Sequence, residues 1–136
     1  RGVVNLVAVG SPLQGIFYSK LVQPIDKLMP NLKWELHHYT QVNNLDRTSA
    51  PIQLMNRADT RQRLLDRIEA FHALEGTQDM VVMRSARLRV EGLSPEAKQR
   101  VHHYLIGGAM HVGFAGITQD PRTVLLIVKI VTGLPL

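Results

Sequence analysis

The 136-residue sequence contains no cysteine, which excludes disulfide bonds, thiolate metal sites and cysteine nucleophiles from this chain. Aromatic residues make up only 5% of it, whereas proteins that bind single-stranded nucleic acid usually stack bases on aromatic side chains. Long apolar runs are also missing. The run 124–128 is interrupted by Lys129, far short of the roughly 20 residues that a membrane span requires. We therefore expect no membrane span, and neither a secretory signal peptide nor a low-complexity tract is visible.

What the chain does contain is typical of a globular α/β protein. Apolar residues make up 45% of the sequence and charged residues 20%, which indicates a folded domain rather than disorder. The length suggests one domain or part of one, able to bury roughly two-thirds of its unfolded surface. Because the first residue is Arg1 and a strand-like run follows almost at once, the sequence looks like an internal fragment or a processed chain.

The formal net charge of +5 would permit an anionic partner such as nucleic acid. The basic residues are scattered, however, and the densest group is interleaved with acids, as on the solvated face of a helix. That group consists of Arg57, Arg61, Arg63 and Arg67, with Asp59 and Asp66 among them. The composition therefore favours solubility over nucleic-acid binding as the role of this charge.

No nucleotide-binding, zinc-protease or EF-hand motif is present, so we expect no cofactor. Histidines occur as the adjacent pairs His37-His38 and His102-His103. Neighbouring residues on a strand point to opposite faces, so His102 and His103 cannot bind one metal ion together. A zinc site needs three or four converging ligands, and we expect no metal site.

Strand-like and helix-like segments alternate along the chain, which predicts an α/β fold with a mainly parallel sheet and flanking helices. Residues 13–51 match no layer of that sheet and are expected to form a lid- or cap-like insertion within the single domain 1–136. The expected elements are strands at 3–9, 70–76 and 101–106, a helix at 52–69, a short helix from Ser94-Pro95, and a buried, apolar helix from Asp120-Pro121 to about Thr132.

Ser11, Asp79 and His111 each follow a predicted strand, where parallel sheets place their functional groups. Histidine can act as a general base near neutral pH, and an aspartate can hold its ring in one tautomer. Asp79 and His111 are therefore candidate partners, although 32 positions separate them. A second interpretation stays open, because Gly-x-x-Asp after a strand is also a common turn.

Three segments resemble α/β-hydrolase lipases and esterases, in the order that this family has. "VVNLVAVGSPLQG" (3–15) resembles the strand and turn that follow the nucleophile helix and lead into the lid. "EGTQDMVVMRSARL" (75–88) resembles the segment that contains the acid. "GGAMHVGFAGITQDPRTVLLIVKIV" (107–131) resembles the histidine loop and final helix. Each motif is unspecific by itself, and the segment 16–51 matches nothing in the family.

The resemblance implies that Asp79 is the acid and His111 the base of a catalytic triad acting on an ester or lipid-like substrate. It also implies a lid over an acyl pocket that Leu13, Ile16 and Phe17 help to line, although core packing explains these three residues equally well. Ser11 stays a turn residue in this picture, because "VGSPLQG" is not a G-x-S-x-G motif.

The chain departs from the family in one serious respect, since it contains no G-x-S-x-G nucleophile motif. It therefore resembles only the C-terminal half of the fold and should be inactive alone, because nothing in it can attack an ester carbonyl. A half-sheet starting at Val3 would expose an apolar edge, so we expect another chain segment or an oligomer to cover it. The competing hypothesis is a non-catalytic basic α/β module that binds a protein or nucleic-acid partner.

Overall fold

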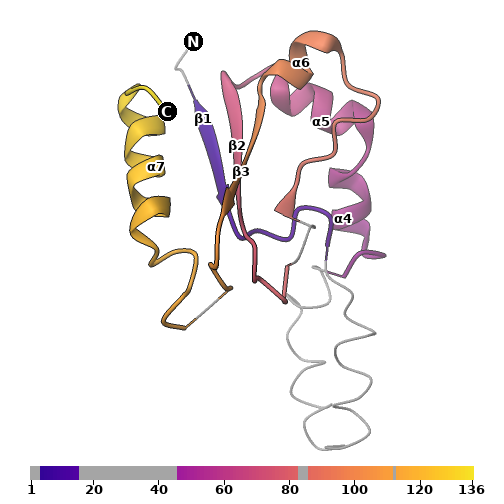
Figure 1. Ribbon diagram of the computed structural model, residues 1–136. Coiled ribbons are helices and arrows are strands. Elements are labelled where there is room, and N and C mark those ends of the chain that lie inside the picture. The colour runs from indigo at the N-terminus through magenta and orange to yellow at the C-terminus, as the bar shows by residue number, and fades with distance from the viewer. Residues whose placement is uncertain (1–3, 16–45, 83–85, 112) are drawn as a thin grey trace, which may run out of the picture.

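A parallel three-stranded sheet forms the centre of the molecule (Figure 1). The computed structural model describes residues 4–15, 46–82, 86–111 and 113–136. The strands are β1 (Asn5–Val9), β2 (Ala70–Gly76) and β3 (Val101–Ile106), hydrogen-bonded in that order. Both pairings are parallel, and His72 of β2 lies opposite Val7 on one side and His102 on the other. The predicted α/β class and all three predicted strands are confirmed.

Helices lie on both faces of this sheet (Figure 1). One face is covered by α7 (Pro121–Thr132), and the other by α4 (Ala50–Met55), α5 (Ala58–Leu65) and α6 (Pro95–Gln99). The predicted insertion 13–51 falls largely on residues 16–45, which lie outside the described residues, so this prediction stays untested.

The alternation of side chains along β2 divides the core into two clusters, one on each face. Phe71 and Ala73 pack with Leu65 of α5 and Ala97 of α6. Leu74 points the other way and packs with Ile106, Ala109 and Ile117, against which α7 also lies. Because β2 is the middle strand and is covered on both faces, six of its seven residues are buried. Burial on both faces extends to its two polar side chains, His72 and Glu75, which are 5% and 8% exposed.

Local side-chain chemistry fixes both predicted helix starts. Ser94 accepts a hydrogen bond from the amide of Ala97 at the start of α6, and Asp120 accepts one from the amide of Arg122 at the start of α7. A proline occupies the first turn of each helix, where its missing N–H is not needed. Gly133 ends α7 in the left-handed conformation, at φ 71°.

The single helix predicted at 52–69 is wrong, because the chain forms two helices there. Asn56 lies at the break, and its side-chain amide donates to the carbonyl oxygens of Ile52 and Leu13 at 2.8 and 3.1 Å. The side chain thus competes with the helical ladder and ties the break to the loop after β1.

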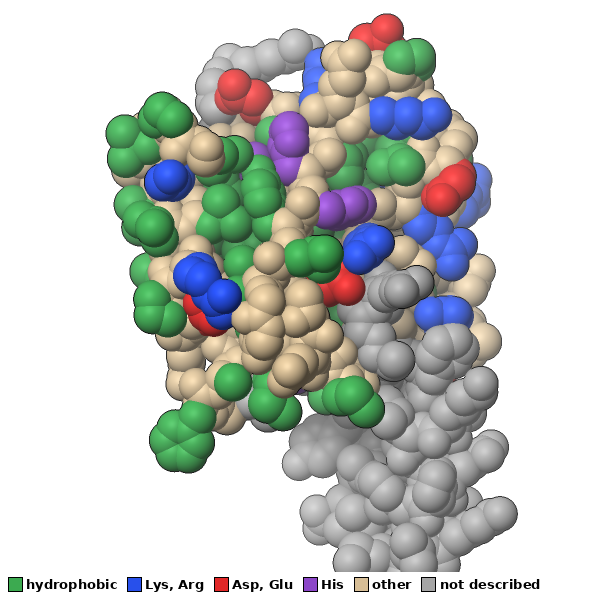
Figure 2. All heavy atoms as spheres, in the orientation of Figure 1, with side chains coloured by type: hydrophobic (Ala, Val, Ile, Leu, Met, Phe, Trp, Pro, Cys, Tyr) green, Lys and Arg blue, Asp and Glu red, His purple; other side chains and the backbone are tan. Residues whose placement is uncertain are grey.

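Two burial predictions are also wrong. Helix α7 was expected to be largely buried, yet only Thr123 and Ile130 are buried in it. In the described part of the chain α7 is the only helix on its face of the sheet, so the side of α7 that faces away from the sheet stays exposed (Figure 2). Arg61 was expected on a solvated face, but it is 5% exposed and donates to the carbonyl oxygen of Glu91 at 2.8 Å.

One buried histidine makes stability depend on pH. His72 stacks on His102 with ring centroids 5.0 Å apart, and its Nδ1 lies 3.1 Å from the hydroxyl of Tyr104. Burial, and secondarily the charge of His102, lower the pKa of His72. The unfolded state, with a pKa of about 6.5, then binds the proton more readily, so folding stability falls as the pH drops below that value.

We expect His72→Gln to reduce this loss of stability. Urea unfolding at pH 7.5 and pH 5.5 should show a smaller fall in the free energy of unfolding for the variant than for the wild type. An equal fall in both proteins would show that His72 is not the group responsible.

Candidate active site

The two side chains that the sequence pairs lie in contact at the carboxyl end of the sheet. Asp79 follows β2 and His111 follows β3, and Nδ1 of His111 lies 2.9 Å from Oδ2 of Asp79. The Asp79 side chain is only 1% exposed, whereas that of His111 is 33% exposed. The expected approach of the two residues is confirmed, while their catalytic role stays a prediction.

The two oxygens of the Asp79 carboxylate have different partners. Oδ1 accepts hydrogen bonds from the amides of Val81 and Val82 at 3.0 and 2.9 Å, and Oδ2 faces His111. The Asp79 amide donates to the carbonyl oxygen of Gly76 at 3.2 Å. The turn interpretation and the partner interpretation are therefore both right, because the same carboxylate closes a local turn and orients the imidazole.

A short closed loop holds His111. Around it the amide of Met110 donates to the carbonyl oxygen of Ala115 at 2.7 Å, and the amide of Ile117 donates to the carbonyl oxygen of Met110 at 2.8 Å. With a proton on Nδ1 directed at the carboxylate, Nε2 is the basic nitrogen. The His111 side chain is 33% exposed, so the ring is not sealed in the core.

Backbone hydrogen bonds tie the acid loop to the histidine loop. The amides of Thr77 and Gln78 donate to the carbonyl oxygens of Ile106 and Ala109 at 3.1 and 3.0 Å. The amide of Gly108 donates to the hydroxyl of Thr77 at 2.8 Å. The 32-residue separation in sequence is thus bridged by direct contacts between the ends of β2 and β3.

Two glycines make this packing possible. A Cβ atom at Gly76 would collide with the carbonyl of Ala109. Gly10, which ends β1 at φ +53°, has its Cβ position 3.6 Å from Oδ2 of Asp79 and 3.8 Å from Nδ1 of His111. The carboxyl ends of all three strands therefore lie close to the pair. At Gly10 and Gly76 only backbone atoms occupy the space where a side chain would otherwise stand. The sequence analysis missed both glycines, although each directly follows or ends a predicted strand.

Of the three residues predicted to line an acyl pocket, only Leu13 is described, and it belongs to the core rather than to the pair. Leu13 is half-buried and packs against the core cluster of Leu65 and Phe71, and Ile16 and Phe17 lie outside the described residues. The Ser11 hydroxyl donates to the carbonyl oxygen of Val9 at 3.4 Å, within the turn.

Exposed apolar side chains flank the pair, and the sequence analysis missed them. Met80 and Val81 directly follow Asp79, and Met110 precedes His111. Phe114, in the histidine loop, is fully exposed. The sequence signal that could have identified them is their position close beside the predicted site residues Asp79 and His111. These four exposed side chains, Met80, Val81, Met110 and Phe114, lie on the two loops that hold the pair, and we call them the apolar rim.

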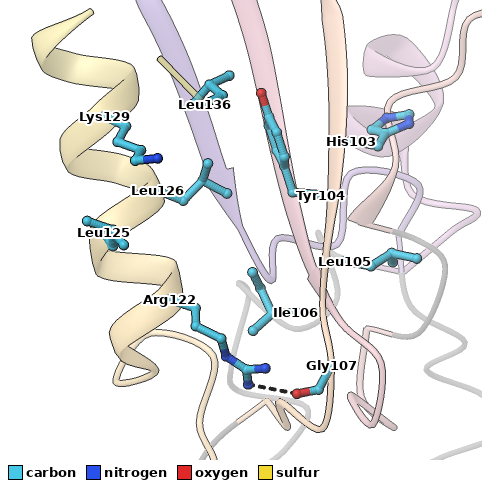
Figure 3. A pocket seen from close by; sticks show the side chains of 10 residues that line it. All are labelled: His103, Tyr104, Leu105, Ile106, Gly107, Arg122, Leu125, Leu126, Lys129 and Leu136. Atoms are coloured by element: carbon cyan, nitrogen blue, oxygen red, sulfur yellow. Dashed lines mark hydrogen bonds between the residues drawn. The ribbon is translucent and has the colours of Figure 1, made fainter. Parts of the chain in front are cut away.

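A groove of about 470 Å³ lies between β3 and α7, away from the Asp79–His111 pair (Figure 3). Tyr104 and Ile106 point from β3 toward Leu126 of α7, and the Arg122 guanidinium donates to the carbonyl oxygen of Gly107 at 2.7 Å across the lower end. Neither Asp79 nor His111 lines this groove.

Comparisons with protein-family models, curated proteins and solved structures gave no match to this chain. Within the described ranges, no group of three or more His, Asp or Glu side chains is placed to hold a metal ion. No helix of the described part is long and apolar enough to cross a membrane. The geometry of Asp79 and His111 is therefore the observation from which a function can be argued.

We expect Gly76→Ala to destabilise the protein, because its Cβ would force the acid and histidine loops apart. Overpacking of this kind costs roughly 1–3 kcal/mol. Gly107→Ala is the matched control, since its Cβ would meet only the Arg122 guanidinium, at 3.9 Å, and should change stability by less than about 0.5 kcal/mol. Denaturant unfolding of both variants measures the difference, and equal stability would show that the loops tolerate a side chain at position 76.

Proposed function

We propose that this chain supplies the acid and the base of a serine-hydrolase triad that cleaves carboxylic esters. The observation that supports the proposal is the 2.9 Å contact between His111 and a buried, immobilised Asp79 at the carboxyl ends of parallel strands. A partly exposed imidazole backed by a carboxylate is the arrangement that activates a hydroxyl nucleophile. The order acid before histidine also agrees with the resemblance to lipases and esterases.

In the proposed reaction, Nε2 of His111 takes the proton of a serine hydroxyl as its oxygen attacks the ester carbonyl. Asp79 stabilises the imidazolium that forms. When the tetrahedral intermediate collapses, His111 returns the proton to the departing alkoxide, leaving an acyl-enzyme. In deacylation His111 takes a proton from water as the water oxygen attacks the acyl carbonyl, and it returns that proton to the serine oxygen as the acyl–serine bond breaks and the carboxylic acid leaves. We propose that the serine comes from outside residues 1–136, because this chain contains no G-x-S-x-G motif.

The surroundings of the pair fit an ester or lipid-like substrate. The apolar rim around His111 would contact hydrocarbon on either side of the scissile bond. Transfer of apolar surface from water onto such a rim favours binding by roughly 25 cal/mol per Å². A rim of this kind gives no advantage to a strongly polar substrate.

One edge of the described sheet is open to a further strand, which could belong to the segment that provides the serine. Strand β1 is at the edge of the described sheet, and Leu6 on it and Val4 just before it are exposed. Open apolar edges favour pairing with another strand. We propose that another segment of the protein, or a second subunit, pairs with β1 and covers the exposed side of α7.

Replacing the base tests the assignment. In the full-length protein, His111→Ala should lower the hydrolysis rate of a short-chain 4-nitrophenyl ester by at least about 10³-fold. His103→Ala is the control, because His103 is an exposed histidine of β3 away from the pair. Circular dichroism should show that both variants are folded. Unchanged hydrolysis in folded His111→Ala would rule out His111 as the base.

A serine-directed fluorophosphonate should locate the nucleophile. We expect mass spectrometry of the labelled full-length protein to find the modification outside residues 1–136, and Ser11→Ala to be labelled as strongly as the wild type. Labelling of Ser11 itself would contradict the proposed division of the triad.

A further inference from the structure

A second cavity, of about 180 Å³, lies where the loop after β1 meets the break between α4 and α5. Three arginines line it, Arg47, Arg57 and Arg89, together with the amides of Gln14 and Asn56. Figure 2 shows Lys and Arg side chains gathered on the α4–α6 side of the molecule. Among the described residues, the charged side chains that line this cavity are all arginines, unlike the apolar rim.

Two of these arginines, Arg57 and Arg89, have no described carboxylate to themselves. Arg57 pairs with Asp59 at 3.0 Å, but Arg63 pairs with the same carboxylate at 3.1 Å. Arg89 donates through Nε to the side-chain oxygen of Gln14 at 3.2 Å, and no described carboxylate lies within 4.0 Å of its guanidinium. The terminal nitrogens of Arg89 thus remain available to an additional acceptor.

The walls of the cavity are fixed by other contacts. The Gln14 amide donates to the carbonyl oxygen of Arg87 at 2.9 Å, and the Asn56 amide donates to the carbonyl oxygen of Leu13 at 3.1 Å. These bonds join the β1 loop, the helix break and the 86–94 segment. The arginines are therefore arranged around a frame that needs no ligand to form, which reduces the entropic cost of binding.

We propose that this cavity binds the anionic end of the substrate, a carboxylate or phosphate group, during the ester hydrolysis proposed above. Planar guanidinium groups bind such oxyanions through paired hydrogen bonds, and the volume suits a group of that size. The inference about the substrate rests on the proposed function, whereas anion binding itself does not.

The distance between the Asp79–His111 pair and the arginine-lined cavity limits the length of the proposed substrate. A Cβ atom at Gly10 would lie 3.6 Å from Oδ2 of Asp79 and 3.8 Å from Nδ1 of His111, and Gln14 lines the cavity four residues later. Four residues span at most about 14 Å, and the turn bonds at Leu13 and Gly15 shorten this path. An ester group at His111 and an oxyanion in the cavity can therefore belong to one molecule with a short aliphatic spacer.

Anion binding is tested first, without any reaction. Inorganic phosphate titrated into the full-length protein at constant ionic strength should give saturable amide NMR shifts around Gln14 and Asn56. Arg89→Gln should weaken this binding about fivefold. Arg63→Gln is the control, because Arg63 shares Asp59 with Arg57 but does not line the cavity. Absent saturation, or equal weakening in both variants, would overturn the cavity as an anion site.

Kinetics then test the substrate. We expect Arg89→Gln to raise KM about fivefold for 4-nitrophenyl hemi-esters of dicarboxylic acids, and to leave KM unchanged for neutral esters of equal length. Equal effects on both ester series would overturn the assignment of the substrate, even if phosphate binds. If neither ester is cleaved while phosphate still binds, the hydrolase proposal fails and the anion site remains.

Discussion

The structure of the site depends on one close approach, the backbone contact between the ends of β2 and β3. Gly76 lies against the carbonyl of Ala109, and the amides of Thr77 and Gln78 bond across the same gap. Without this contact, Asp79 and His111 would project from neighbouring strands without meeting. The parallel register sets the direction of both loops, and the missing side chain at position 76 sets their separation.

Much of the fold could be predicted because its signals are local. A Val-rich run identified β1, short segments between turn signals identified β2 and β3, and the Ser-Pro and Asp-Pro pairs identified the starts of α6 and α7. Errors occurred where tertiary contacts override local patterns. Asn56 breaks the expected helix by bonding to a distant loop, Arg61 is drawn inward by the Glu91 carbonyl, and α7 stays exposed because burial depends on neighbours that periodicity does not specify.

The same distinction applies to the site. Asp79 and His111 could be paired from sequence because both follow strands of a parallel sheet, where the side chains of neighbouring loops converge. The role of Gly10 and Gly76 could not be predicted, since it arises from the register between strands rather than from spacing along the chain. The arginine-lined cavity was hidden for a related reason, because it combines three segments far apart in sequence.

The self-contained turn at Asp79 has a consequence for the order of assembly. Its carboxylate is oriented by amides only two and three residues ahead, so this half of the site has very low contact order and can form early in folding. The imidazole instead depends on the parallel pairing of β3 with β2, across the connection 77–100. Closing that longer loop costs more chain entropy than the local turn at Asp79, so the two halves of the site differ in what it costs to order them.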